Sequence, residues 1–359
     1  MGTEGAPRTL LRLIVPACLP KSESTPVPST PSVSSRSGWL SSVLLALGLP
    51  VIAYTPAYAE QCKLAQLGEL PVTMRGARPL VHAGINGADG LFIADSGAFY
   101  STLTKSAAEQ HKLPLQNAPV YFGMSGVGGE AHTLLTIVRT FTIFGQPIPN
   151  VDFFVVDQGL DPGVAGVIGQ NVFRLGDVEY DLAHNVIRIM RADGCKNTPL
   201  AYWAAAESKP FSVIEIDAPT RLAPHTTGVA YVNGIQIRVL FDTGAEHSVL
   251  TLDAAKRAGV TSESAGVVAA GGWQGIGPGS GKTWIAPFTS FRIGDEEIRN
   301  THLRIGSEKL KVDMLLGADF FLSHRVYVAP GRRELYFTYN GGPVFDLKTD
   351  SPPKPASAP

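Results

Sequence analysis

Two stretches of the chain share one signature, Phe92-Ile93-Ala94-Asp95-Ser96-Gly97-Ala98 and Val239-Leu240-Phe241-Asp242-Thr243-Gly244-Ala245. Each is an apolar run that ends in Asp, a hydroxyl residue, Gly and Ala. An Asn-Gly pair precedes both at the same distance, at Asn86 and Asn233. An apolar pair and a glycine follow later in both, ending at Gly169 and Gly317. A repeat of this length in only two copies implies two copies of one domain, because a solenoid needs more.

These motifs resemble those of the retropepsin and pepsin-type aspartic proteases, over roughly residues 75 to 345. The resemblance implies a mostly β fold of two homologous retropepsin-like β-barrel lobes related by a pseudo-twofold axis. Each lobe is expected to have a short helix after its Asp loop, at 105–111 and at 252–258. The abundance of glycine and proline, 38 and 27 residues, also favours short strands joined by turns.

The composition is sufficient for two hydrophobic cores, and the net charge does not indicate a charged partner. A chain of 359 residues with 44% hydrophobic content can bury two ordinary cores. The net charge of −1 implies no bulk attraction to nucleic acid or to a membrane surface. No spacing of His, Cys, Asp or Glu indicates a metal site, and no cofactor is expected.

The two ends of the chain are predicted to lie outside the fold. Residues 1–59 combine a disordered Ser-, Pro- and Thr-rich leader with a signal peptide, whose apolar stretch ends in the small-x-small pattern Ala57-Tyr58-Ala59. The protein is therefore expected to be exported, to the periplasm or outside, and an uncleaved signal segment would tether it to a membrane. The remaining parts are an N-terminal lobe at 60–197, a linker at 198–212, a C-terminal lobe at 213–345 and a disordered tail at 346–359.

Removal of the leader leaves two cysteines, Cys62 and Cys195, at opposite ends of the first repeat. In an oxidising compartment this placement suggests a disulfide that closes the N-terminal lobe. Two free thiols are the alternative, since sequence alone does not fix pairing.

The paired Asp residues suit hydrolysis of a peptide bond by an activated water. Two carboxyls held close together cannot both ionise cheaply, so one serves as acid and the other as base, and the pair titrates as a unit. The catalytic candidates are Asp95 and Asp242. The resemblance implies support from their loops and from the distal glycines, namely Ser96, Gly97, Ala98, Thr243, Gly244, Ala245, Gly169 and Gly317.

Individual roles follow for these supporting residues. The glycines of the Asp loops are expected to allow a tight turn and a close approach of backbone amides. In relatives the hydroxyl residues cross-link the two loops. Ala98 and Ala245 stand where pepsin-like enzymes usually have a hydroxyl donor, so the pKa values of the dyad should be higher than in pepsin, with an optimum in the mildly acidic to near-neutral range.

Two Gly-rich segments, at 123–129 and 271–281, fall where the family carries flaps that close over the substrate. The candidates for substrate contact there are Tyr121, Met124, Gly126, Trp273 and Gly275. The alternative is that the aromatic residues only pack their own hairpins.

These observations predict a single-chain aspartic endopeptidase that acts on peptide or protein substrates, binds no nucleic acid and works as a monomer. Two alternatives remain open. The lobes of different chains could complete each other in a dimer, or the protein could be a non-catalytic exported binder of peptides or another ligand that keeps the fold.

Overall fold

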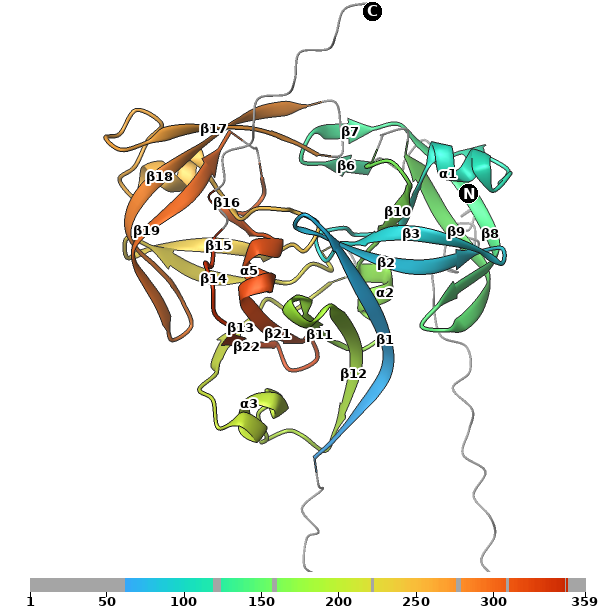
Figure 1. Ribbon diagram of the computed structural model, residues 1–359, viewed down its shortest axis with the longest axis horizontal. Coiled ribbons are helices and arrows are strands. Elements are labelled where there is room, and N and C mark those ends of the chain that lie inside the picture. Colours follow the sequence, from blue (N-terminus) through green and yellow to red (C-terminus); the bar gives the residue numbers. More distant parts are fainter. Residues whose placement is uncertain are drawn as a thin grey trace, which may run out of the picture.

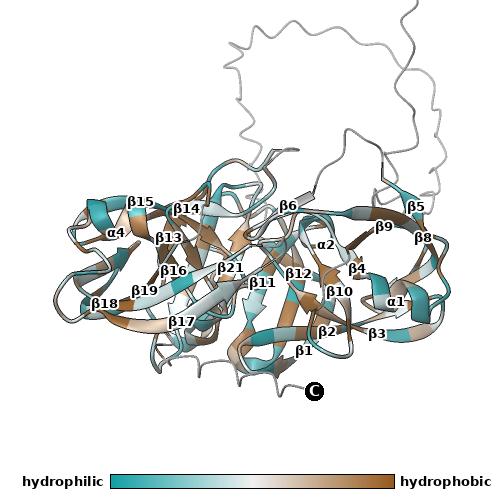
Figure 2. Cartoon of the chain, turned by 90° about the horizontal axis from the view of Figure 1, so that it is seen from above, coloured by the Kyte–Doolittle hydropathy of each residue, from teal (hydrophilic) through white to brown (hydrophobic). Residues whose placement is uncertain are grey.

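The computed structural model describes residues 62–118, 124–156, 160–220, 223–275, 279–307, 310–345 and 347. The expected leader, signal peptide and nearly all of the expected tail lie outside these residues. The described chain is mostly β and forms two lobes side by side, which confirms the predicted fold class. Helix α4 (Leu252–Arg257) lies at one outer end of the molecule and α1 (Lys105–Gln110) at the other (Figure 2).

The N-terminal lobe contains β1 (Lys63–Arg75), β2 (Arg78–Ile85), β3 (Ala88–Ala94), β4 (Thr102–Thr104), α1, β5 (Gln116–Asn117), β6 (Met124–Gly126), β7 (Gly129–Ala131), β8 (Thr133–Ile143), β9 (Gln146–Val156), β10 (Val164–Ile168), α2 (Gln170–Phe173), β11 (Asp177–Asp181), the 3-10 turn η2 (Leu182–His184) and β12 (Val186–Asp193). Helix α3 (Tyr202–Glu207) follows. The C-terminal lobe contains β13 (Ser212–Glu215), β14 (Thr227–Val232), β15 (Ile235–Phe241), β16 (Val249–Thr251), α4, β17 (Val268–Gln274), β18 (Ser280–Ile293), β19 (Glu296–Gly306), β20 (Met314–Leu316), α5 (Ala318–Ser323), β21 (His324–Ala329) and β22 (Glu334–Tyr339).

The sequence repeat is also a structural repeat. The hairpins β2–β3 and β14–β15 both turn at an Asn-Gly pair, with positive φ at Asn86 and Gly87 and again at Asn233 and Gly234. Positive φ at both turn positions is the geometry that Asn-Gly favours in a two-residue hairpin. The helices after the Asp loops are also alike, since Thr104 and Thr251 each cap one through a side-chain oxygen that accepts a backbone N–H.

One part of the largest sheet is shared by both lobes. Its strand order runs β13-β22-β21-β11-β12-β1, and β11 of the N-terminal lobe pairs with β21 of the C-terminal lobe. In Figure 1 this sheet lies opposite the hairpins β6–β7 and β17–β18. The lobes are therefore joined by backbone hydrogen bonds as well as by the covalent chain.

The segment predicted as the linker, 198–212, connects the two lobes and contains a folded helix. It contains α3, whose Trp203 side chain is 4% exposed, stacks on Tyr327 and donates from Nε1 to Thr338 Oγ1 at 2.8 Å. The alanine run that reads as a linker forms a helix because alanine is the best helix former, and the adjacent tryptophan supplies the buried surface.

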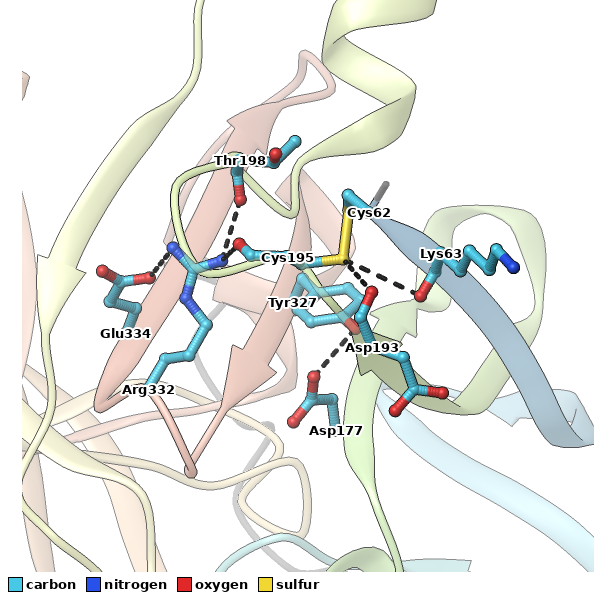
Figure 3. The surroundings of a disulfide bond; sticks show 9 residues. All are labelled: Cys62, Lys63, Asp177, Asp193, Cys195, Thr198, Tyr327, Arg332 and Glu334. Carbon is cyan, nitrogen blue, oxygen red and sulfur yellow. Dashed lines mark hydrogen bonds and ion pairs between the residues drawn. A yellow bond between two sulfur atoms is a disulfide. The ribbon is translucent and has the colours of Figure 1, made fainter. Parts of the chain in front are cut away.

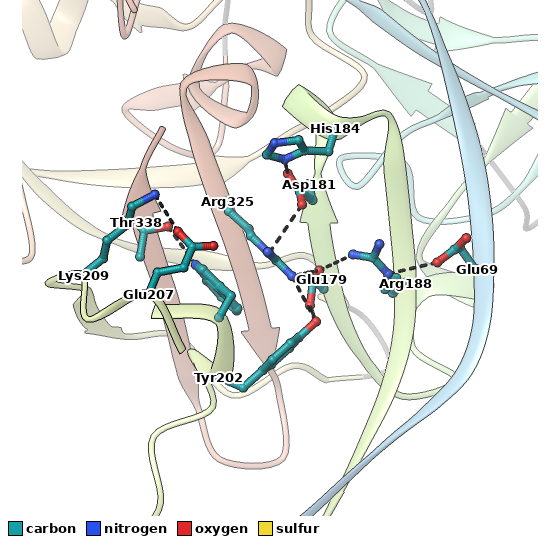
Figure 4. A network of polar contacts seen from close by, with 11 residues as sticks. Glu69, Glu179, Asp181, His184, Arg188, Tyr202, Glu207, Lys209, Arg325 and Thr338 are labelled. Carbon is teal, nitrogen blue, oxygen red and sulfur yellow. Dashed lines mark hydrogen bonds and ion pairs between the residues drawn. The ribbon is translucent and has the colours of Figure 1, made fainter. Parts of the chain in front are cut away.

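A buried ionic network crosses the shared sheet (Figure 4). The carboxylate of Glu179 on β11 is fully buried and accepts hydrogen bonds from Arg188 at 2.6 Å, Arg325 at 2.8 Å and the Tyr202 hydroxyl at 2.5 Å. Because Arg325 lies on β21, this network fixes one lobe against the other. A buried carboxylate with several charged partners holds its geometry closely, since losing one partner is costly.

The predicted disulfide between Cys62 and Cys195 is present (Figure 3). It joins the start of β1 to the chain just after β12. Arg332 from the C-terminal lobe donates to the carbonyl oxygen of Cys195 at 2.9 Å, so the bonded end is also held by the other lobe. Among the residues described, no helix has both the length and the apolar character that a membrane span requires.

Replacing both cysteines by alanine is expected to lower the free energy of unfolding by about 3–5 kcal/mol, because the bond closes a long loop in the unfolded chain. The bond spans a sequence separation of 133 residues. Denaturant unfolding of the variant and of the wild type, each with and without a reductant, measures this effect. A reductant should destabilise only the wild type, and an unchanged midpoint in the variant would show that the bond contributes nothing.

Candidate active site

The structure brings the two Asp loops together between the lobes. Asp95 follows β3 and Asp242 follows β15, and their carboxyl groups hydrogen-bond each other. Each loop is held by a parallel strand of its own lobe: Asp95 N donates to Ile168 O and Asp242 N donates to Leu316 O, both at 2.9 Å. The same backbone arrangement thus delivers one carboxyl from each lobe.

Four hydrogen bonds cross-link the two loops through their hydroxyl residues. The backbone N–H of Ser96 donates to Thr243 Oγ1, and that of Thr243 donates to Ser96 Oγ, both at 2.9 Å. Each hydroxyl then donates to the opposite lobe, Ser96 Oγ to Phe241 O at 2.8 Å and Thr243 Oγ1 to Ala94 O at 2.7 Å. Both side chains are buried, so this cross-link, expected from the resemblance, is fully protected from water.

The glycines of the loops are needed for space rather than for a turn. Gly97 and Gly244 lie in the expected tight turns, which are closed by hydrogen bonds of 3.3 Å from Ala98 N to Asp95 O and from Ala245 N to Asp242 O, but neither glycine has a positive φ. A Cβ on Gly97 would lie 2.3 Å from Cγ of Asp242, and one on Gly244 would lie 2.2 Å from Cγ of Asp95. The expected amide contact is present, since each glycine N–H donates to the Asp of its own loop at 2.8 Å and 2.9 Å. Each lobe therefore leaves room for the carboxyl of the other.

The distal glycines lie directly against the Asp loops. A Cβ on Gly169 would lie 2.9 Å from Ala98 O, and one on Gly317 would lie 2.8 Å from Ala245 O. The next residues also bind these carbonyls, through Gln170 N at 2.9 Å and Ala318 N at 2.7 Å. A side chain is therefore excluded at both positions.

A second pair of supports was missed by the sequence analysis. Ser101 Oγ donates to Asn171 Oδ1 at 2.8 Å and accepts from Gly169 N at 3.0 Å. In the other lobe Ser248 Oγ donates to Asp319 Oδ1 at 2.6 Å and accepts from Gly317 N at 2.9 Å. The signal was available in the repeat, because both serines and both partners stand at matching places, yet nothing in either motif alone shows that they meet.

Burial is the main cause of a raised pKa at both carboxyls. It raises the pKa of Asp95 well above its ordinary value, and the charge of Asp242 raises it further. Burial also raises the pKa of Asp242. High pKa values were expected because positions 98 and 245 lack hydroxyl donors. The backbone supplies some donation there, from Ala245 N to Asp242 Oδ1 at 3.3 Å, but desolvation is the larger effect.

The raised pKa values predict how stability depends on pH. A carboxyl with a raised folded pKa binds its proton more tightly in the folded state, so folding loses stability as the pH rises from about 4, the unfolded value, towards the folded value. Asn mimics the protonated acid and removes this loss. Asp95→Asn is therefore expected to raise the melting temperature more at pH 7 than at pH 4. Thermal unfolding at both pH values measures it, and an equal shift at the two would contradict the assignment.

The two Gly-rich hairpins, one from each lobe, approach each other (Figure 1). Gly279 N, in the C-terminal hairpin, donates to Gly128 O in the N-terminal one at 2.7 Å, and a Cβ on Gly275 would lie 3.2 Å from Val127 Cβ. The two hairpins therefore touch each other near their turns, and their role as flaps stays a prediction.

The flap candidates have different positions. Met124 and Gly126 lie on β6, and Gly275 follows β17 close to the contact between the hairpins. Trp273 packs on its own hairpin, since a Cβ on Gly281 would lie 2.3 Å from its Nε1, and that nitrogen is buried without a hydrogen-bond partner. Tyr121 lies outside the described residues.

Comparison with protein families gives one match in each lobe. The family described as aspartyl protease matches residues 81–172, and the family described as gag-polyprotein putative aspartyl protease matches residues 229–323. Each match contains one Asp motif and its distal glycine. The search of curated proteins gives no match.

Two solved structures are similar to the chain. The EIAV protease complexed with the inhibitor HBY-793 is 25% identical, with a TM-score of 0.23, and the alignment covers 27% of this chain and 86% of that one. Basic 7S globulin from soybean is 11% identical, with a TM-score of 0.41, and the alignment covers 77% and 95% of the two chains.

Proposed function

The chain belongs to the retropepsin-like aspartic proteases, and we propose that it is an active endopeptidase whose whole dyad comes from one polypeptide. The observation that carries the proposal is the contact between the half-buried Asp95 and Asp242 side chains, whose carboxyls each lie against the glycine of the opposite loop. Two carboxyls in direct contact share one proton at pH values where two carboxyls far from each other would both be ionised.

The shared proton permits both halves of peptide hydrolysis. The ionised carboxyl takes a proton from a water molecule while the water oxygen bonds to the carbonyl carbon of the peptide. The protonated carboxyl donates its proton to the carbonyl oxygen. The tetrahedral diol then collapses: the C–N bond breaks, the nitrogen receives a proton from one carboxyl, and a diol hydroxyl returns its proton to the other. No role is assigned to one Asp alone, because the pair titrates together.

Substrate binding as an extended strand fits the flaps. The hairpins β6–β7 and β17–β18 are antiparallel strand pairs, and an extended peptide can pair with the edge of such a hairpin while its side chains enter pockets on alternate sides. The contact between the flap turns requires that they open to admit the chain of a protein substrate.

The second carboxyl favours catalysis over simple binding. A binder gains nothing from a second buried acid, which costs both desolvation and repulsion.

We also propose export to an oxidising compartment, since a disulfide persists there and the leader has the pattern of a signal peptide.

Cleavage of an unbiased peptide library between pH 3 and pH 8, by protein that starts at Glu60, tests the proposal. Cleavage with a maximum in the mildly acidic to near-neutral range, blocked by a pepstatin-type inhibitor, is expected. A maximum near pH 2–3 would contradict the raised pKa values. A folded monomer that cleaves nothing but retains bound peptides would instead be the non-catalytic binder.

A further inference from the structure

The pseudo-twofold repeat is broken at two positions beside the dyad. Arg78 precedes Asn86 by the same number of residues as His225 precedes Asn233. Phe99 follows Asp95 at the distance at which Glu246 follows Asp242. The Asp loops, their hydroxyl residues and their glycines match between the lobes. The two lobes therefore differ locally, with a charged residue in one lobe where the other has an aromatic one.

On one side of the axis the exchanged residues form an ion pair between the lobes. Arg78 Nε lies 2.5 Å from Glu246 Oε1, and Arg78 Nη1 lies 2.7 Å from Asp161 Oδ2. All three side chains stay partly open to solvent, with exposed fractions of 28%, 38% and 33%. Arg75 reaches the same loop by donating to Pro162 O at 3.2 Å. We call this group the charged site.

On the other side the matching residues are aromatic. The His225 ring meets Phe99 edge-on at 6.0 Å between centroids, Phe99 contacts Tyr100 at 4.3 Å, and Tyr100 contacts Phe154 at 5.1 Å. The His225 ring lies beside the Gly97 backbone, and burial lowers the pKa of His225, which favours its neutral form. Phe99, Tyr100 and His225 are half-buried. We call this group the aromatic site.

Both sites adjoin the reacting centre. Glu246 and Phe99 each follow an Asp loop directly, and Gly97, which His225 contacts, lies against the Asp242 carboxyl. A peptide held over the dyad extends to both sides of it and therefore passes both groups. An apolar side chain laid over the charged site removes water from the ion pair at a cost, whereas a polar one replaces that water.

We propose that the charged site and the aromatic site fix the direction in which substrate binds. A polar or charged side chain of the peptide is bound beside Arg78, Asp161 and Glu246. An aromatic or bulky aliphatic side chain is bound beside His225, Phe99 and Tyr100, on the other side of the scissile bond. This inference rests on the proposed endopeptidase function and adds its substrate class, a peptide of asymmetric sequence.

Cleavage-site profiling of Glu246→Leu and Phe99→Glu beside the wild type tests the proposal. Each variant should change the preference at positions on one side of the scissile bond only, opposite sides for the two variants, by about 10- to 100-fold in kcat/KM for the disfavoured class. Arg299→Gln breaks an exposed ion pair with Glu297 and serves as the matched control, with an unchanged profile.

Three outcomes would overturn the proposal. The wild type could prefer the same residues on both sides, one variant could change both sides alike, or the variants could lower only the melting temperature and the overall rate. The last result would make the ion pair a structural link between lobes. Peptide binding to Asp95→Asn gives a second readout: selective retention of asymmetric peptides without wild-type cleavage would contradict the proposed function alone, and absence of both would contradict both.

Discussion

Replacing Asp95 or Asp242 by Asn is expected to lower kcat by at least about a thousandfold, which is the usual scale for removing a general acid or base. Asn keeps the shape of the side chain but cannot exchange a proton with water or with the peptide. Both variants should be equally inactive, because the two carboxyls act as one unit through their mutual hydrogen bond. Single-turnover cleavage of the best library peptide measures the loss.

The controls separate chemistry from folding. Asp193→Asn changes an acid that is 61% exposed and paired with Arg191, away from the dyad, and should keep activity within about twofold. The two dyad variants should melt no lower than the wild type at neutral pH, because Asn removes a buried charge. If one dyad variant keeps most of the wild-type rate, the shared dyad is wrong.

The second large effect is expected from a single methyl group. Gly97→Ala and Gly244→Ala keep the backbone N–H that binds the carboxyl of the same loop, but the new Cβ overlaps the Asp of the opposite lobe at 2.3 Å and 2.2 Å from Cγ. The loops must separate, so we expect kcat to fall by at least about a hundredfold. The free energy of unfolding should fall by about 1–3 kcal/mol, the range found for overpacked cores.

A matched control for this substitution is present in the chain. Gly331 has no heavy atom within 4 Å of its Cβ position and no positive φ, so Gly331→Ala should leave both rate and stability nearly unchanged. Cleavage assays and thermal melts of the three variants compare them directly. Full activity in Gly97→Ala would show that the loops do not approach each other as closely as the structure has them.

Much of the site followed from the sequence because it is encoded in short motifs. The duplicated Asp motifs, their distal glycines and the bracketing cysteines each led to a feature that the structure contains. The amide contact of Gly97 followed as well, but its packing against the other lobe did not, because the atom that excludes a side chain there belongs to Asp242. Local sequence shows that a glycine is present, whereas only the packed lobes show why.

The joining of the lobes was the least predictable feature. Strands β11 and β21 pair although Tyr180 and Val326 are far apart in sequence, and nothing in either strand indicates the partner. The segment 198–212 was predicted to be a linker because it contains prolines and a run of alanines, and its composition did not show that Trp203 packs against the shared sheet. The exchange of Arg78 for His225 can be read from the spacing of the repeat, but only the packed lobes show that Arg78 pairs with Glu246 of the other lobe.

The central claim, that one chain builds the complete dyad, is tested most directly by mixing two inactive variants. Asp95→Asn and Asp242→Asn are refolded together in equal amounts and assayed beside the wild type. If each chain builds its own dyad, every molecule in the mixture still lacks one carboxyl. The mixture is then expected to stay as inactive as either variant alone. Recovery of a substantial fraction of wild-type cleavage would show that lobes of different chains complete each other, and would contradict a dyad formed within one chain.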